Sequence, residues 1–143
     1  MSIKPPKNKI KLANKHKELL CFATSYLDIY VTDDDNIVDN DIQELYDFVR
    51  YKTAQSHYSL NGMYESTDII ASKVQLATAG SEMVVNVLAV ATSCVMVLIE
   101  DNVFKGSELL RAKRLTNNIY NKIENYKDEA FLNAMKIIAK VTK

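Results

Sequence analysis

The chain has 143 residues, of which 48% are hydrophobic and 25% charged, and its 18 basic and 18 acidic side chains give a formal net charge of zero. The length predicts one domain, and the composition is that of an average soluble globular protein. Three Gly and two Pro are too few for a loop-rich or all-β protein. We therefore expect an all-α fold, a single-domain bundle of five or six helices over residues 9–143 that follows a flexible basic arm at residues 1–8.

The zero net charge conceals a strong partition along the chain. Residues 1–17 carry six Lys and no acid, and residues 18–104 carry three basic and fourteen acidic side chains. Residues 105–143 carry nine basic and four acidic side chains. Two basic ends therefore flank an acidic middle.

The N-terminus and the cysteines indicate a cytoplasmic protein. The first seventeen residues are charged where a signal peptide needs an apolar segment. Cys21 and Cys94 form no CxxC pair and lie in apolar patterns, so we expect small buried hydrophobic residues in a reducing compartment. Lys, Asn, Ile and Tyr make up 47 of the 143 residues, a bias that suits the AT-rich coding sequences of many phages and viruses.

A first amphipathic helix is predicted over residues 9–31, where apolar residues recur at three- and four-residue spacing. The segment TDDDNIVDND, residues 32–41, has short polar side chains that favour turns and caps, so it ends this helix. The positions expected to be buried are Leu12, His16, Leu19, Leu20, Ala23, Tyr26, Leu27 and Tyr30.

Two further helices are predicted after the acidic segment. Asp41, with Glu44 three residues later, is a capping-box variant that predicts the start of a second helix, and the Asn-Gly pair at 61–62 predicts its end. Its expected buried face consists of Ile42, Leu45, Tyr46, Val49 and Thr53. A third helix is expected over residues 66–80, because Ser or Thr can cap its start and Gly can end it.

Residues 83–99, MVVNVLAVATSCVMVLI, run for seventeen positions without a charge. They would barely span a hydrocarbon core of ~30 Å, and their edges carry no Trp, Tyr, Lys or Arg anchor, which argues against a membrane span. A strand is usually about 5–6 residues long, so the length favours a helix. We predict a buried central helix over residues 81–103, with a polar seam formed by Glu82, Asn86, Ser93 and Glu100.

A long basic helix is predicted at the C-terminus, over residues 107–141. Gly106 is expected to end the central helix and Ser107 to cap this one. Its apolar residues step by 3.6 positions on average, so one unbroken helix of about 35 residues, on the order of 50 Å long, fits as well as two helices with a break near residues 125–128. An unbroken helix exceeds what one small bundle can cover, which would require a second chain to bury part of its apolar stripe.

No catalytic or cofactor-binding motif occurs in the sequence: GxGxxG, the P-loop, HExxH and GxSxG are all absent. The two histidines, His16 and His57, have no Cys or second His at a metal-ligand spacing. We therefore expect no enzyme activity, no cofactor and no metal site.

The acidic segment matches a calcium loop in part. With Asp33 at position 1, acids fall at positions 3, 7, 9 and 12. Position 5 is Ile37, however, and position 6, where the loop needs Gly, is Val38. We therefore favour a solvated loop whose acids cap helices and contact the basic ends over a divalent site.

Two sets of charged residues are the candidate contact sites. The basic set can bind nucleic-acid phosphates or an acidic partner and consists of Lys7, Lys9, Lys11, Lys15, Lys17, Arg111, Lys113, Arg114 and Lys122. The acidic set can bind a basic partner and consists of Asp33, Asp34, Asp35, Asp39 and Asp41. Pairing between the sets of two copies would give head-to-tail rings or filaments.

The chain resembles two families in architecture. Its size and hydrophobic central helix are similar to those of Bcl-2-like proteins of large DNA viruses, although Gly80-Ser81-Glu82 stands where that family carries an Asn-Trp-Gly-Arg signature. Its size is similar to that of small head-to-tail connector proteins of tailed phages. The chain also begins, as theirs do, with a helix, an acidic loop and a second helix. Neither family has a diagnostic motif in this sequence.

We therefore expect a non-enzymatic assembly or interaction protein, without a membrane partner, that self-associates through helix faces and complementary charge. Nucleic-acid binding through the Lys-rich arm and the basic C-terminal helix is the alternative, although only three of the eighteen basic residues are Arg. A small-ligand-binding or Bcl-2-like helical protein is the second alternative.

Overall fold

The computed structural model describes residues 11–57 and 87–123, together with residues 132, 135, 136 and 139. All regular structure in this part of the chain is α-helical, which confirms the all-α prediction. The helices are α1 (Asn14–Thr32), α2 (Asn40–His57), α4 (Val87–Glu100) and α5 (Gly106–Lys122). The bundle of five or six helices is not confirmed, because the described residues form four; the basic arm at 1–8 and the helix predicted over 66–80 lie outside them.

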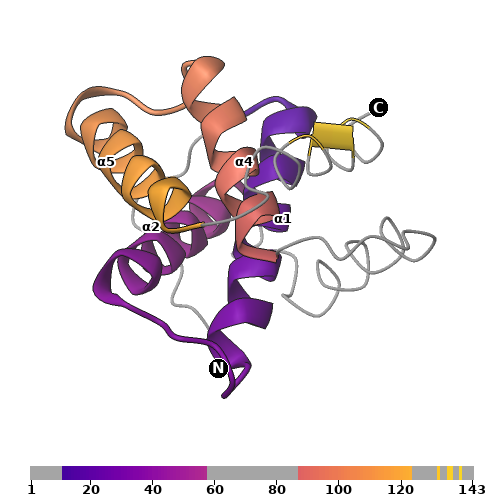
Figure 1. Ribbon diagram of the computed structural model, residues 1–143. Coiled ribbons are helices and arrows are strands. Elements are labelled where there is room, and N and C mark those ends of the chain that lie inside the picture. Colours follow the sequence, from indigo (N-terminus) through magenta and orange to yellow (C-terminus); the bar gives the residue numbers. More distant parts are fainter. Residues whose placement is uncertain (1–10, 58–86, 124–131, 133–134, 137–138, 140–143) are drawn as a thin grey trace.

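The four helices form a closed set of neighbours (Figure 1). α1 and α4 make the most extensive contact, and α2 and α5 each pack against one of these two and against each other. α1 and α4 are antiparallel, because His16 near the start of α1 lies 3.0 Å from the carboxylate of Asp101, just beyond the end of α4. α1 and α2 are antiparallel as well, since the Thr24 and Thr53 hydroxyls meet at 2.8 Å and the Tyr46 hydroxyl donates to Asp28 at 2.6 Å.

α1 is buried on every side over half of its length. Residues 19–27 are all buried, and nine consecutive residues turn through every face of a helix. The amphipathic pattern indicates only one buried face, so the prediction was too narrow: Phe22, Thr24 and Ser25 are buried too, and Cys21 is buried as expected. His16, expected inside, keeps a side-chain exposure of 22%.

α4 confirms the helical interpretation of the uncharged segment for residues 87–100. Residues 88–95 are all buried. The predicted polar seam is wrong at Ser93, which is 1% exposed and donates its hydroxyl to the carbonyl of Ala89. None of the described helices is both long enough and apolar enough to cross a membrane.

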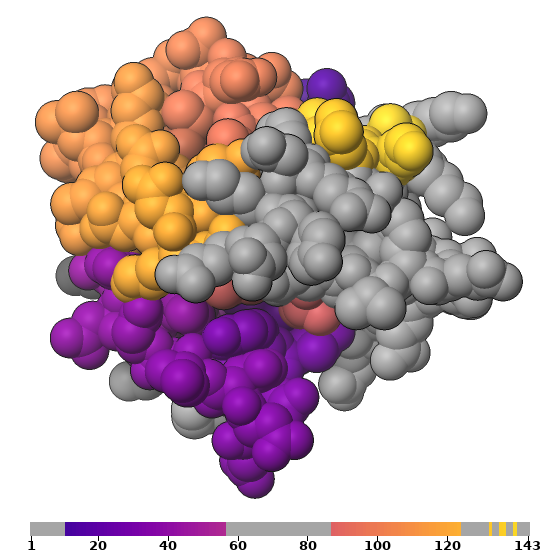
Figure 2. Space-filling model, viewed as in Figure 1, coloured from indigo at the N-terminus to yellow at the C-terminus, as the bar shows by residue number. Residues whose placement is uncertain are grey.

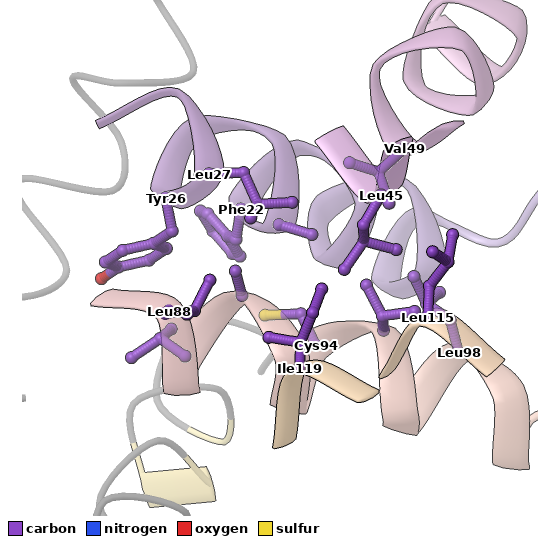
Figure 3. Packing of buried hydrophobic residues seen from close by; sticks show 14 of the residues in the cluster. Phe22, Tyr26, Leu27, Leu45, Val49, Leu88, Cys94, Leu98, Leu115 and Ile119 are labelled. Carbon is purple, nitrogen blue, oxygen red and sulfur yellow. The ribbon is translucent and has the colours of Figure 1, made fainter. Parts of the chain in front are cut away.

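The hydrophobic core lies where all four helices converge (Figure 3). Its side chains come from helices far apart in the sequence and include Phe22, Tyr26, Leu27, Leu45, Val49, Leu88, Cys94, Leu98, Leu115 and Ile119. Phe48 and Phe104 add a tilted aromatic pair with ring centroids 5.2 Å apart. Burial of one such side chain is worth about 1.5–3 kcal/mol, so this cluster is the main source of stability.

Hydroxyl-bearing residues enter this core at little cost. The buried hydroxyls of Thr24, Thr53, Thr92, Ser93 and Thr116 each donate to the backbone carbonyl four residues earlier. Such a bond satisfies the hydroxyl inside its own helix, so the side chain needs no water.

Two helix ends differ from the prediction. Asp39, and not Asp41, caps α2, since its carboxylate accepts the N–H of Ile42 at 2.9 Å. α4 ends at Glu100, and the left-handed residue that closes it is Asn102, not Gly106. Asn102 has a φ of 60°, and its N–H and that of Val103 donate to Ile99 and Leu98 in the pattern of a Schellman motif.

The C-terminal helix is not continuous. α5 ends at Lys122, and Ile123 has a φ of −77° and a ψ of 85°, outside the helical range. The break therefore comes slightly before residues 125–128. Leu132, Met135, Lys136 and Ala139 are helical again, and Met135 packs against the core. The buried stripe predicted for this region is confirmed at Ala112, Leu115, Ile119 and Ile123.

Replacement of Leu98 by Ala should lower the free energy of unfolding by about 2–5 kcal/mol, because Leu98 is fully buried where α4 meets its neighbours. Leu110→Ala is the matched control, since Leu110 is 70% exposed on α5 and should change stability by less than about 0.5 kcal/mol. Urea unfolding followed by circular dichroism measures both. Equal effects of the two substitutions would contradict the placement of α4 in the core.

Candidate functional site

A series of ion pairs joins α2 to α5 across the surface shown in Figure 2, where α5 (orange) adjoins the purple surface of the earlier helices. Glu44 of α2 accepts hydrogen bonds from Arg111 at 2.9 Å and Arg114 at 3.0 Å. At one end Lys122 donates to both Asp39 and Asp41. At the other end Lys52 donates to Glu108 at 2.9 Å. The two helices are therefore antiparallel, with α5 docked on the acidic start of α2.

These contacts alter the titration of the groups involved. The hydrogen bond from Arg111 is the main reason that the pKa of Glu44 lies below its usual value. Partial burial alone would raise the pKa of Asp39, but the hydrogen bonds from Lys122 and the N–H of Ile42 bring it below the ordinary value. The bond to Asp39 raises the pKa of Lys122. Each carboxylate is thus stabilised in its charged form.

The structure pairs much of the predicted basic and acidic sets within one chain. Arg111, Arg114 and Lys122 contact Glu44, Asp41 and Asp39 of their own chain. The Arg111 guanidinium also lies over the Phe48 ring, 5.2 Å from its centroid. Lys113 is exposed and has no ion pair among the described residues. Pairing within the chain reduces what α5 can offer to nucleic acid or to a second copy.

The remaining acids, Asp33, Asp34 and Asp35, occupy an ordered turn between α1 and α2. We call residues 33–37 the acidic turn. Two hydrogen bonds tie it to α1: the Tyr30 hydroxyl donates to the Ile37 carbonyl at 3.0 Å, and the Asn36 amide donates to the Tyr30 carbonyl at 3.1 Å.

Inside the acidic turn, Asp33 accepts the N–H of Asp35 at 3.0 Å, which is a typical Asx-turn. The three aspartates are exposed and have no ion pair within the described residues. Ile37 at its end is 82% exposed, and Ile29 at the end of α1 is 40% exposed. The acidic turn thus presents free carboxylates and an ordered apolar side chain together.

The opposite end of α1 is basic. Lys11 and Lys15 are exposed and Lys17 is half-buried, whereas Lys7 and Lys9 lie outside the described residues. Lys15 lies 3.8 Å from the carboxylate of Asp101.

The charges of α1 add to its helix dipole. Its first turn holds no acid and its last turn no base, although acids are favoured at the positive N-terminal end of a helix and bases at the negative C-terminal end. Lysines lie at the N-terminal end of α1, and the acidic turn follows its C-terminal end. α1 therefore joins a positive and a negative end about 28 Å apart.

Sequence reasoning missed one charged residue, Lys52. Its side chain is 7% exposed and lines an open cleft of about 480 Å³ between the starts of α1 and α5. The signal was present in the periodicity, because residue 52 follows the buried Leu45 and Phe48 at seven and four residues on α2. A lysine in a buried stripe indicates an internal charge with a partner.

The other candidate site residues are the two cysteines and the possible metal ligands. Both cysteines are buried and neither forms a disulfide. Burial raises the pKa of Cys94 to about 12, so its thiol is inert at neutral pH. No group of three or more His, Cys, Asp or Glu residues in the described part of the chain could hold a metal ion. The carboxylates with calcium-loop spacing at 39, 41 and 44 are instead bonded to the cations of α5.

Glu44→Gln should weaken the docking of α5 by about 0.2–1 kcal/mol per lost ion pair at neutral pH. Because the folded-state pKa of Glu44 is lowered, its contribution is complete above the unfolded pKa of about 4.3 and disappears as the pH falls through the folded value. Urea unfolding should therefore separate the variant from the wild type at about pH 7 but not at about pH 2. Asp47→Asn, on an exposed acid bonded to Gln43, should match the wild type at both values.

Comparison of the chain with protein-family models, with curated proteins and with solved structures finds no match. The function must therefore be argued from the charged ends of α1, the ion pairs of α5 and the cleft.

Proposed function

We propose that this chain is a non-enzymatic assembly protein that associates head to tail, with the acidic turn of one copy contacting the basic N-terminal segment of the next. The observation that carries the proposal is the acidic turn. Hydrogen bonds tie it to α1, yet its three carboxylates have no ion pair among the described residues and Ile37 is 82% exposed. A hydrogen-bonded turn with such charges and an exposed apolar residue supports recognition of another surface.

The charge distribution favours a second copy as the partner. The acids that follow the acidic turn, at 39, 41 and 44, are bonded within the chain, whereas the three aspartates of the turn have no ion pair among the described residues. Lysines precede and begin α1, at its other end. Two copies aligned along α1 would bring these opposite charges together, and their helix dipoles would then point the same way.

The ion pairs of α5 argue against the alternative function, nucleic-acid binding. Three of its four predicted contact residues, Arg111, Arg114 and Lys122, already hold carboxylates. A phosphate would have to displace these carboxylates, which offsets the gain from releasing counterions. Association with a second copy uses the carboxylates of the acidic turn and Lys11, which have no ion pair among the described residues.

The association should weaken as salt rises from about 0.1 M to about 1 M, because the Debye length falls from ~10 to ~3 Å over this range. Sedimentation velocity in the absence of nucleic acid measures the mass. Asp34→Lys should shift the distribution to the monomer at low salt, since the side chain of this exposed residue makes no hydrogen bond to the described residues.

Asp47→Lys is the control, because it changes the net charge by the same amount on an exposed site of α2. It should leave the mass unchanged. A monomer at every salt concentration, or equal dissociation by both substitutions, would refute the proposed assembly.

A further inference from the structure

The open cleft at the start of α1 has the size of a small-molecule site. It measures about 480 Å³, within the range of about 300–1,000 Å³ that such sites occupy. Its walls come from the residues that precede α1, from α2, from the loop after α4 and from the start of α5. The charged and titratable side chains that line it are Lys11, His16, Lys52, Asp101, Lys105 and Glu108.

Lys52 carries an unfilled donor at this cleft. Its ammonium group is buried, and its two hydrogen bonds, of 2.9 and 3.2 Å, go to the two oxygens of one carboxylate, that of Glu108. An ammonium group has three N–H donors, so one has no acceptor among the described residues. Because an unsatisfied buried donor is costly, an anionic oxygen bound in the cleft would stabilise this lysine.

The two carboxylates of the cleft do not oppose an anion. Glu108 is neutralised by Lys52. Asp101 is bonded to His16 at 3.0 Å and lies 3.8 Å from Lys15. The unpaired charges are those of Lys11 and Lys105, both exposed and without an ion pair in the described part of the chain. The cleft therefore retains a positive excess.

Backbone donors add to these cations. Ala13 and Lys105, the residues that precede the first turns of α1 and α5, both line the cleft, and neither helix start has a side-chain cap. The first N–H groups of a helix have no acceptor within the helix. Uncapped starts favour an anion beside them, since N–H donors and the positive end of the dipole coincide there.

We infer that this cleft binds the phosphate group of a small ligand, held by Lys11, Lys52 and Lys105. A phosphate suits this site better than a carboxylate, because three ammonium groups and the uncapped helix starts offer more donors than two oxygens can accept. The inference goes beyond the proposed assembly and does not depend on the acidic turn.

Titration with inorganic phosphate and pyrophosphate at constant ionic strength tests the inference, with amide chemical shifts as the readout. The amides of Gly106 and Ser107 should shift with phosphate and not with an equivalent amount of chloride. Lys11→Gln and Lys105→Gln should each weaken binding roughly tenfold, the loss expected for one charge-assisted contact. Lys52 is left intact, because its removal would strand Glu108.

Lys113→Gln is the matched control, since it removes the same charge from an exposed site of α5 outside the cleft. It should leave phosphate binding unchanged. If Lys113→Gln weakened phosphate binding as much as Lys11→Gln, or if chloride shifted the same amides equally, the binding would come from general surface charge. Either result would overturn the inference.

Two more measurements separate this site from other partners. Asp34→Lys should abolish assembly but leave phosphate binding intact, so failure of either proposal is seen independently. The second measurement compares an oligonucleotide with a mononucleotide. An oligonucleotide that binds far more tightly would replace the small ligand with a nucleic-acid backbone and would contradict the inference.

Discussion

The antiparallel pair of α1 and α4 is the constraint on which the rest of the structure depends. Both helices are buried on all sides over residues 19–27 and 88–95, so neither could exist as a surface helix with one face in water. Enclosing them removes a large apolar area from solvent, and this area is the main favourable contribution to folding. α2 and α5 pack against this pair and against each other.

Polar groups are accommodated around that pair in two ways. The hydroxyls inside the core bond to the carbonyls of their own helices, so they require no specific partner on another helix. Charged side chains lie on the outer surface between α2 and α5, where basic groups of α5 form exposed ion pairs with acids at the start of α2. Such exposed pairs contribute little energy each, so they orient α5 more than they hold it in place.

This internal pairing decides which charges remain available to partners. Asp39 and Asp41 of the acidic segment serve as cap and anchor for α2 and α5, whereas the aspartates of the acidic turn face solvent. Most basic residues of α5 are likewise engaged, whereas Lys11 and Lys105 beside the cleft have no ion pair among the described residues. The inferred phosphate site lies at the basic end of α1, which is also the end that the acidic turn of the next copy contacts in the proposed assembly.

The sequence by itself determined the helical class, the helical nature of residues 87–100 and the inward face of α5. On α2 it indicated Ile42, Leu45, Val49 and Thr53 as buried but missed Phe48. These features follow from periodicity and from the scarcity of Gly and Pro, which are local properties of the chain. It also showed the acidic segment and the basic ends. It did not show that α1 is buried on every side, because Thr24 and Ser25 look like surface residues until neighbouring helices enclose them.

Only the tertiary structure decided how the charges are paired. The contact between Glu44 and Arg111 joins residues 67 positions apart, and no local pattern specifies which acids α5 will meet. The helix ends also became visible only in the structure: the carboxylate of Asp39 caps α2, and Asn102 and Ile123 leave the helical range after α4 and α5. The cleft has the same origin, since residues of α1, α2 and α5 form it only after these helices have packed.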